Sequence, residues 1–265
     1  MRLLTTFAGD NSMRSILCIW LVLTCAALQA AEPETPPVFH SRNPRVPTPI
    51  WVSAEEALDS SGRIRPGTVR SGEAYQLHRI IDALPPDWEL DTAPAASPRC
   101  EYTFGALVDD APNMSSPPDW ENLANRAATG KVFFGRVTGT RVGLYHGTPF
   151  TVVTVRARQA TSETEPVTVH VLYPKGSLLI EGRRICTDDS RYTAAPHVGE
   201  EIVFVATNSV SSEGSLYRVP AEQVFFERGG RLVIPRGLRR DPHVRSLGSL
   251  EAVRDALLSR RRATR

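Results

Sequence analysis

Seven short runs of β-branched and aromatic residues fill the second half of the chain, and they constrain its fold more than any other feature. Gly, Pro, Asp or Ser residues separate each run from the next. The runs cover residues 131–137, 150–156, 167–173, 177–180, 201–206, 215–219 and 223–227. Strands of this length at close spacing are typical of an antiparallel sandwich or barrel. The sequence therefore predicts a mainly β domain over residues 100–235.

The run from Val167 to Tyr173 illustrates how these strands divide their side chains. Its odd-numbered residues are apolar, and His170 lies in the middle of the other face. Because side chains alternate across a strand, we expect the odd-numbered face in the core and the His170 face to be semi-exposed. The paired glycines of Arg228–Arg231 predict a tight hairpin turn that leads into a further strand over residues 232–234.

Helical patterns flank the predicted strands. Ser53 and Glu56 form a capping box, which predicts a helix that begins at Ser53. The other predicted helices cover residues 73–84, 119–129 and 249–259, with Ser116 and Pro117 as the cap and first turn of the second of these. Residues 31–99 are predicted to form a proline-rich leader with short helices, since eleven of the 21 prolines lie there and exclude a continuous sheet.

The first 30 residues read as a secretory signal peptide. Arg14 precedes thirteen uncharged residues, 16–28, and small residues follow up to a predicted cleavage site after Ala30. The apolar run is shorter than the roughly 20 residues that a spanning helix needs. A retained anchor and a lipid anchor at Cys25 are the alternatives. The protein is therefore expected to be exported, to the periplasm or the extracellular space.

Cleavage after Ala30 would leave Cys100 and Cys186 as the cysteines of the mature chain. In an oxidising compartment this pair predicts a single disulfide, and two unpaired buried thiols are the alternative. No histidine or further cysteine stands at metal-ligand spacing from either residue, so a metal site at this pair is not expected. The mature chain would carry 29 basic and 28 acidic residues, which implies no general attraction to nucleic acid or membranes.

The order of these features resembles a known family. It runs through Cys100, the strand 132–137, the strand 151–156, Cys186 and the run 198–205. This pattern is similar to that of the netrin-like OB-fold barrels, which include the tissue inhibitors of metalloproteinases, and especially to that of bacterial exported relatives of unassigned function. The resemblance covers about residues 100–228. It implies a small antiparallel OB-like barrel of about five to seven strands with flanking helices.

The chain departs from the inhibitors of that group in two respects. Those inhibitors act through a cysteine at the mature N-terminus, whereas the mature end expected here lies near Ala31, far from any cysteine. Their several disulfides are reduced to one. The resemblance therefore implies the shape of the barrel only, and it assigns an inhibitory role to no residue of this chain.

Motifs that carry catalysis or bind cofactors are missing from the sequence. The Gly-x-Ser-x-Gly signature of serine hydrolases is absent, and the six histidines match no zinc pattern. No phosphate loop or dinucleotide fingerprint occurs, so no cofactor and no metal are expected. Asp188 and Asp189 could contribute to a site if they lie in a loop, but a polar turn is the simpler interpretation. Nucleic acid is not an expected partner, because export removes access to it.

Residues 236–265 form a basic C-terminal helix and tail, with nine arginines against three acidic residues. Arg260, Arg261 and Arg262 are candidates for a weak contact with anionic lipid head groups or an acidic envelope partner. A solvated, frayed tail is the alternative.

These observations favour a non-catalytic, exported β-barrel protein that binds a protein or a cell-envelope component. An envelope hydrolase is the alternative function, with a site assembled from loop residues such as Asp188, Asp189 and His197. A structural protein that associates with itself is a third possibility. The sequence names no catalytic residue and leaves the ligand unidentified.

Overall fold

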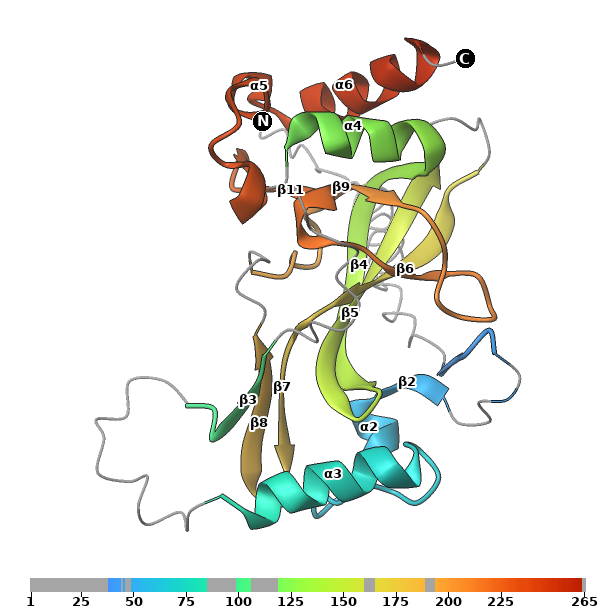
Figure 1. Ribbon diagram of the computed structural model, residues 1–265, viewed down its shortest axis with the longest axis vertical. Helices are drawn as coiled ribbons and strands as arrows, with labels where there is room; N and C mark the ends of the chain where they lie inside the picture. Colours follow the sequence, from blue (N-terminus) through green and yellow to red (C-terminus); the bar gives the residue numbers. More distant parts are fainter. Residues whose placement is uncertain are drawn as a thin grey trace, which may run out of the picture. The chain divides into compact units, whose positions relative to one another are not determined.

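Two long antiparallel strands, β4 and β5, organise the fold of this protein, for which a computed structural model describes residues 38–43, 45, 49–84, 99–105, 119–159, 165–188 and 194–263 (Figure 1). A two-residue turn joins the strands, and both of its residues, His146 and Gly147, have positive φ angles of 48° and 74°. Such angles suit the turns that connect twisted hairpin strands. The predicted strands 131–137 and 150–156 are thus parts of one much longer hairpin.

The larger sheet has nine strands, in the order β10-β6-β5-β4-β9-β11-β12, with β2 paired to the far half of β4 and β1 paired to β2. Its strands are β1 (Phe39–His40), β2 (Pro49–Ser53), β4 (Lys131–Tyr145), β5 (Thr148–Gln159), β6 (Val167–Tyr173), β9 (Glu201–Ala206), β10 (Leu216–Arg218), β11 (Val224–Arg228) and β12 (Arg231–Val233). The prediction of a mainly β fold is confirmed. The expectation of a purely antiparallel sheet is wrong, because β10 runs parallel to β6.

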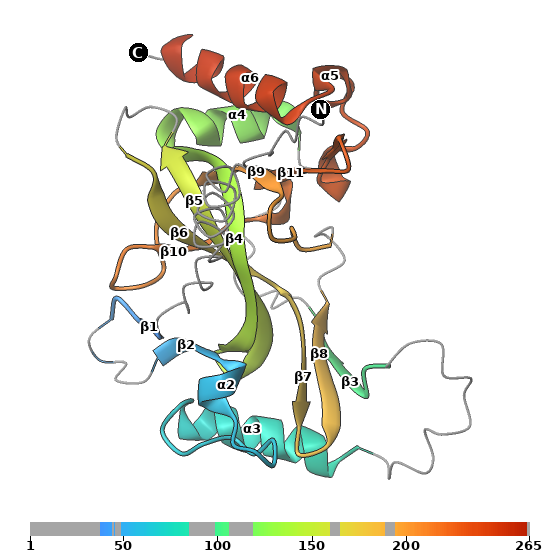
Figure 2. The ribbon, with the colours of Figure 1, turned by 180° about the vertical axis from the view of Figure 1, so that it is seen from behind.

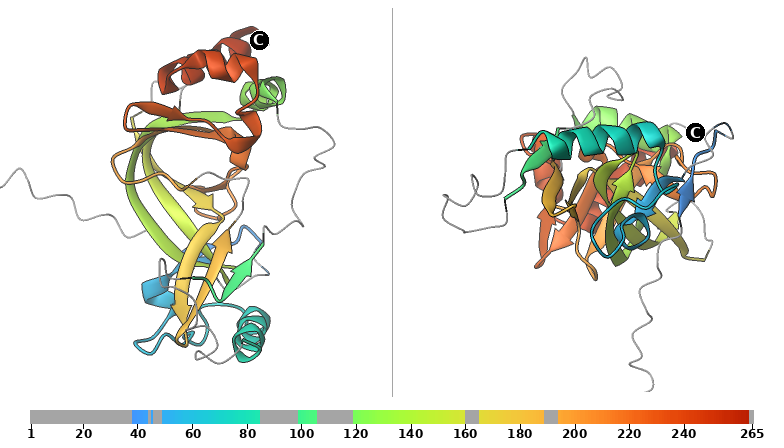
Figure 3. Two further views of the ribbon diagram at one scale, coloured as in Figure 1. Left: turned by 90° about the vertical axis from the view of Figure 1, so that its left-hand side faces the viewer. Right: turned by 90° about the horizontal axis from the view of Figure 1, so that it is seen from below.

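In the part of the sheet order that runs from β10 to β11, six strands lie side by side, and the outer two, β10 and β11, follow each other in the chain. Residues 219–223 separate them, and these include the short 3-10 helix η3 (Ala221–Gln223). In the described residues no ladder pairs β10 with β11, so the hydrogen-bonded path stays open there. Figure 3 shows how strongly β4 and β5 curve. The closed OB-like barrel remains a prediction.

One core cluster lies on one face of this curved sheet. It takes side chains from β4, β5, β6, β9, β10 and β11. Its buried members are Phe133, Val137, Val153, Val155, Ala157, Val169, Val171, Tyr173, Ile202, Phe204, Ala206, Tyr217, Val219, Val224 and Phe226. The odd-numbered face of β6 contributes Val169, Val171 and Tyr173, as its alternation predicts.

On the other face of β6, Thr168 is exposed but His170 and Leu172 are buried, which corrects the expectation of a semi-exposed face at these two residues. His170 is only 4% exposed, and the Phe39 ring meets its imidazole edge-on with 4.9 Å between ring centroids. Phe39 and Trp51, from β1 and β2, form a second cluster over this face together with Leu172. The alternation was read correctly, but it could not reveal that an N-terminal segment covers the second face.

Strand β2 lies in the proline-rich region for which the sequence predicted no sheet. Pro49 is the first residue of the strand, a position that does not require its missing N–H to join an interior ladder. Ser53 pairs with Gly143 of β4, where an added Cβ would lie 2.1 Å from the carbonyl oxygen of Val52. Glycine at position 143 therefore allows this close approach. The described residues all belong to one compact unit, residues 36–265.

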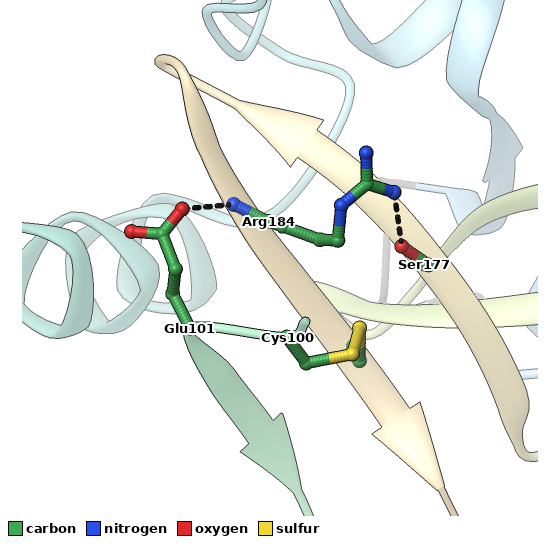
Figure 4. The surroundings of a disulfide bond; sticks show 5 residues. Cys100, Glu101, Ser177 and Arg184 are labelled. Carbon is green, nitrogen blue, oxygen red and sulfur yellow. Dashed lines mark hydrogen bonds between the residues drawn. A yellow bond between two sulfur atoms is a disulfide. The ribbon is translucent and has the colours of Figure 1, made fainter. Parts of the chain in front are cut away.

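A smaller sheet has the order β3-β8-β7, formed by β3 (Tyr102–Phe104), β7 (Lys175–Ile180) and β8 (Arg183–Asp188). The disulfide between Cys100 and Cys186 joins the start of β3 to β8, with 5.8 Å between the Cα atoms, and confirms the predicted pair (Figure 4). Beside it, Glu101 Oε1 accepts a 3.0 Å hydrogen bond from the backbone N–H of Arg184. Strand β8 matches none of the runs predicted from the sequence.

The main helices lie at opposite ends of the β4–β5 hairpin (Figure 2). Their bounds are α2 (Ala54–Ala57), α3 (Ser71–Asp82), α4 (Trp120–Thr129), α5 (Pro242–Leu247), α6 (Leu250–Ala263) and the 3-10 helix η4 (Arg236–Leu238). The Ser53 cap is confirmed, since its side chain accepts a hydrogen bond from the N–H of Glu56. The predicted cap at Ser116 and Pro117 is wrong: Asp119 caps α4 by accepting a 2.7 Å bond from the N–H of Asn122.

Helix α3 packs against the ends of both hairpins. His146, in the β4–β5 turn, lies with Nδ1 3.2 Å from Glu73 Oε1, and His78 Nδ1 lies 3.3 Å from Glu181 Oε1 in the β7–β8 turn. Burial acts to raise the pKa of Glu73, but hydrogen bonds from His146 and from the N–H of Arg70 outweigh it, so the pKa is lowered. Within the described residues, no helix has the length and apolar character needed to cross a bilayer.

Candidate functional site

A groove of about 600 Å³ lies between the N-terminal half of α6 and the outer face of β4, β5, β9 and β11. Its volume falls in the range of small-ligand and peptide sites. The lining residues come from β4, β5, β9, β11 and α6 and from the residues just before β6 and α6. They are Phe134, Gly135, Arg136, Thr138, Arg156, Arg158, Pro166, Glu201, Ile202, Val203, Glu227, Ser249, Leu250, Glu251 and Arg254.

Strand register places the residues on the sheet side of the groove in two rows across the sheet. In the first row, Arg136 of β4 pairs with Arg156 of β5 on one side and with Glu201 of β9 on the other. In the second row, Phe134 pairs with Arg158 and with Val203. These positions alternate with inward-facing core residues, so the pleat directs them to the outer face.

Glycine at position 135 brings the two strands together between these rows. A Cβ at this position would lie 2.2 Å from the carbonyl oxygen of Arg156, so any larger residue would force β4 and β5 apart. A break in register between Val137 and Gly139 marks a bulge at the end of the floor. Bulges increase local twist and redirect side chains, and they recur beside binding sites.

The basic residues of the groove differ in how their charges are compensated. Arg136 lies 3.6 Å from Glu201, in an exposed pair that contributes little to stability. Arg254 lies 5.3 Å above the Phe134 ring, and its hydrogen bond to Asp255 raises the pKa of its guanidinium. Arg156 and Arg158 are exposed and form no ion pair within the described part of the chain. Two guanidiniums without an ion pair to any described residue therefore lie side by side on β5.

The acidic residues lie on the opposite side. Glu201 is on β9, Glu227 on β11 and Glu251 near the start of α6. The groove thus has a basic wall on β5, an acidic wall at Glu201, Glu227 and Glu251, in which Glu251 also pairs with Arg254 at 3.4 Å, and an apolar floor at Phe134, Val203 and Leu250. We call these the β5 wall and the acidic wall.

The described lining of the groove offers arginine and glutamate side chains and an apolar surface to a ligand. It contains no histidine or cysteine, and its serine, Ser249, accepts a 3.1 Å hydrogen bond from the N–H of Ala252 as the cap of α6. Nucleophilic catalysis needs an activating base within hydrogen-bond reach of the nucleophile. Salt bridges and guanidinium hydrogen bonds are the interactions that this set of side chains offers to a ligand.

A second hollow, of about 490 Å³, lies where α4, α5 and α6 meet. Its central carboxylate, Asp241, accepts hydrogen bonds from the N–H groups of Trp120, His243 and Val244. Burial acts to raise the pKa of Asp241, but these three bonds outweigh it and the pKa is lowered. Asp241 thus connects the first residues of α4 to those of α5, and this structural role explains its hydrogen bonds.

Two residues of the alternative hydrolase site, Asp188 and His197, have separate partners among the described residues. Asp188 ends β8 and is bound by the ammonium of Lys175. His197 lies before β9 with its side chain 70% exposed, and its ring is 3.9 Å from Glu200. No contact joins Asp188 to His197 among the described residues, and Asp189 lies outside them. The described ranges also contain no group of three or more residues that could hold a metal ion.

The C-terminal arginines were expected in a helix and tail, and the helix is longer than predicted. Leu250, Val253 and Leu257 of α6 are buried against α4 and the outer face of the sheet. Arg260 is exposed near the end of this helix, while the side chains of Arg261 and Arg262 lie outside the described set. The predicted cleavage site at Ala30 also lies outside the described residues.

Sequence reasoning missed the groove. Arg156 and Arg158 alternate with the buried residues Val155 and Ala157, so their outward direction could have been predicted from the period of two. Their position opposite α6 depends on register and helix docking, which no local pattern specifies. Comparisons with protein families, with curated proteins and with solved structures found no match.

Proposed function

We propose that this chain is an exported, non-catalytic binding protein in which an OB-like barrel presents the groove beneath α6 to a protein or a cell-envelope component. The observation that carries this proposal is the β5 wall, whose two arginines have no ion-pair partner among the described residues. Arginines directly opposite each other on paired strands repel, and such like-charge pairs reduce stability. A basic row that is unfavourable for folding, and that lines a groove, is best explained by an anionic group on a ligand.

The OB-like barrel is supported by strand order. β4, β5, β6, β9 and the interrupted strand formed by β10 and β11 make five members, and the core cluster takes residues from each of them. An OB-fold is a five-stranded barrel that is partly open, so a missing ladder at residues 219–223 is compatible with it. The resemblance to netrin-like domains extends to the architecture alone.

Export is supported by the disulfide and by the signal-like N-terminal sequence. A disulfide persists in oxidising compartments such as the periplasm or the extracellular space, and it is rare in the cytosol. The envelope hydrolase remains the alternative hypothesis, but the described residues supply no catalytic arrangement for it.

Charge reversal of the β5 wall tests the proposed binding function. A photoreactive residue in place of Thr138, which lines the groove, should cross-link a partner in an envelope or secreted fraction. The variant Arg156→Glu/Arg158→Glu should lose that cross-link, because an anionic ligand would then meet two carboxylates. The control Arg79→Glu/Arg245→Glu changes the net charge equally at exposed helix positions and should keep it.

The fold should tolerate the reversal, because the carboxylate introduced at position 156 would face the guanidinium of Arg136, where the wild type has a second guanidinium. Circular dichroism and thermal melting of the charge-reversed variant test whether it keeps the wild-type fold. If cross-links form equally in the reversed variant, or arise equally from a photoreactive residue at Gln76 on α3, the groove is not the binding surface.

A weak contact of Arg260, Arg261 and Arg262 with anionic lipid is a further part of the proposal. The apolar side of α6 is already packed against α4, so such a contact would be electrostatic and without insertion. Removing residues 260–265 should reduce sedimentation with phosphatidylglycerol vesicles at low salt, and moderate salt should abolish the binding of the full chain. Unchanged sedimentation after the truncation would show that these arginines make no membrane contact.

A further inference from the structure

The opposite charges of the two walls restrict what the groove can bind. The β5 wall carries Arg156 and Arg158 without ion pairs in the described part of the chain, while Glu227 and Glu251 lie across the floor from it. A uniformly anionic polymer that filled the groove would be attracted at one wall and repelled at the other. Polyphosphate, sulfated glycans and anionic lipid surfaces therefore fit poorly.

The chemistry of the basic wall favours carboxylates. Guanidinium groups are planar and bind carboxylates through two parallel hydrogen bonds, and adjacent arginines can hold neighbouring carboxylates in this way. Arg156 and Arg158 are two residues apart on one face of β5, so their side chains emerge on the same side of the sheet.

The floor between the walls is apolar. The half-buried Phe134 ring, the buried Val203 and the buried Leu250 separate the β5 wall from Glu227 and Glu251. Burial of one or two apolar side chains against this floor would contribute most of the contact area. The charged walls would set the direction in which the ligand lies.

From this arrangement we infer that the groove binds a short extended peptide segment of a partner protein, with carboxylate side chains on the β5 wall, apolar side chains on the floor and a basic residue at the acidic wall. This inference rests on the proposed binding function and specifies the chemistry of its ligand. Acidic, apolar and basic side chains in that order are available together in a protein segment and not in a glycan or a lipid surface.

Fluorescence anisotropy with labelled peptides tests the inference on the full exported chain. The probe is the hexapeptide Glu-Glu-Phe-Leu-Lys-Lys, and the comparison ligands are Glu-Glu-Phe-Leu-Glu-Glu, short-chain polyphosphate and phosphatidylglycerol vesicles. The probe should bind saturably at low salt, roughly tenfold or more tightly than the all-acidic peptide, because only the probe places a cation at the acidic wall. Added salt should weaken its binding.

Variants of the β5 wall give a sharper result than loss of binding alone. Arg156→Glu/Arg158→Glu should weaken binding of the probe by roughly tenfold or more and should gain affinity for Lys-Lys-Phe-Leu-Lys-Lys, since both walls would then be acidic. A merely unfolded variant would not acquire this new preference. Arg79→Glu/Arg245→Glu should leave both affinities unchanged.

Three outcomes would overturn the inference: no saturable binding of the probe, tighter binding of polyphosphate or vesicles than of the probe, or a β5-wall reversal that does not exchange the peptide preference. If the Thr138 cross-link still depends on Arg156 and Arg158 in those cases, the proposed binding function stands and the peptide chemistry is wrong. If that cross-link is also insensitive to the reversal, the proposed function itself fails.

Discussion

Replacing both Cys100 and Cys186 with serine should lower the Tm of this protein by roughly 8 to 20 °C. The disulfide closes a loop of 86 positions. Chain-entropy arguments assign such a loop roughly 4 to 5 kcal/mol of stability, because the link restricts the unfolded chain. For a chain of this size, each kcal/mol corresponds to about 2 to 4 °C in Tm. Thermal unfolding followed by circular dichroism, with and without reductant, measures the effect.

A local contact beside the disulfide supplies the control. Glu101 Oε2 lies 2.8 Å from the guanidinium of Arg183, and the N–H of Glu101 donates a 2.9 Å bond to the carbonyl of Arg184. These contacts hold the start of β3 on β8 without the sulfur atoms. Glu101→Gln should therefore cause a smaller loss than the double serine variant, and it should do so with the disulfide intact.

The same residues test export. Protein recovered from its native compartment should resist alkylation at both cysteines until it is reduced, and its intact mass should match a chain that begins at Ala31. Two freely alkylated thiols would contradict the proposed location. An unchanged Tm in the double serine variant would contradict the stabilising role of the link, whatever the compartment.

The parts of the fold that the sequence predicted best are those in which a local period coincides with burial. Strands 167–173 and 201–206 were predicted at the bounds that the structure has, and the helix predicted at 73–84 lies at 71–82. In each of these, alternation or helical spacing of apolar residues reports directly on which face is buried. The 228–231 turn was equally predictable, because Gly229 and Gly230 both adopt positive φ.

Prediction failed where an element derives its structure from distant partners. Strand β8 has the sequence Arg183–Asp188, with charged residues at both ends, and it is held by the disulfide and by β7. Strand β2 begins with a proline and exists because Gly143 admits it to the edge of β4. The residues that hold β8 and β2 in place are too far away in the sequence for a local pattern of apolar residues to reveal them.

The candidate groove could be predicted only in part for the same reason. Alternation indicates that Arg136, Arg156 and Arg158 lie on outer faces, but not that register places them in adjacent rows. The docking of α6 over those rows depends on Leu250, Val253 and Leu257 meeting α4 and the sheet. The charges of the site were therefore readable from the sequence, whereas their common location was not.

His170 should make this protein lose stability in mild acid. Burial lowers the pKa of His170 from 6.5 to about 4, since its imidazole lies under Phe39 with Nδ1 3.2 Å from Thr154 Oγ1. Above pH 6.5 the ring is neutral in both the folded and the unfolded chain, so it causes no loss. As the pH falls from 6.5 to 4, the unfolded chain takes up the proton first, and the free energy of unfolding decreases by up to about 3 kcal/mol.

The variant His170→Gln isolates this contribution, because glutamine is neutral throughout and its amide can still reach Thr154. Carboxyl groups with lowered pKa values, such as Glu73 and Glu200, also lose stabilising interactions in acid, but they do so equally in both proteins. Urea unfolding at about pH 7 and about pH 4.5 should therefore show a smaller acid-induced loss for His170→Gln than for the wild type. His197→Gln, at a side chain that is 70% exposed, should retain the wild-type loss. Equal acid-induced losses in the wild type and His170→Gln would contradict this prediction. His170 would then take up its proton as readily in the folded chain as in the unfolded one, which requires that Phe39 moves off the imidazole at a small cost in free energy.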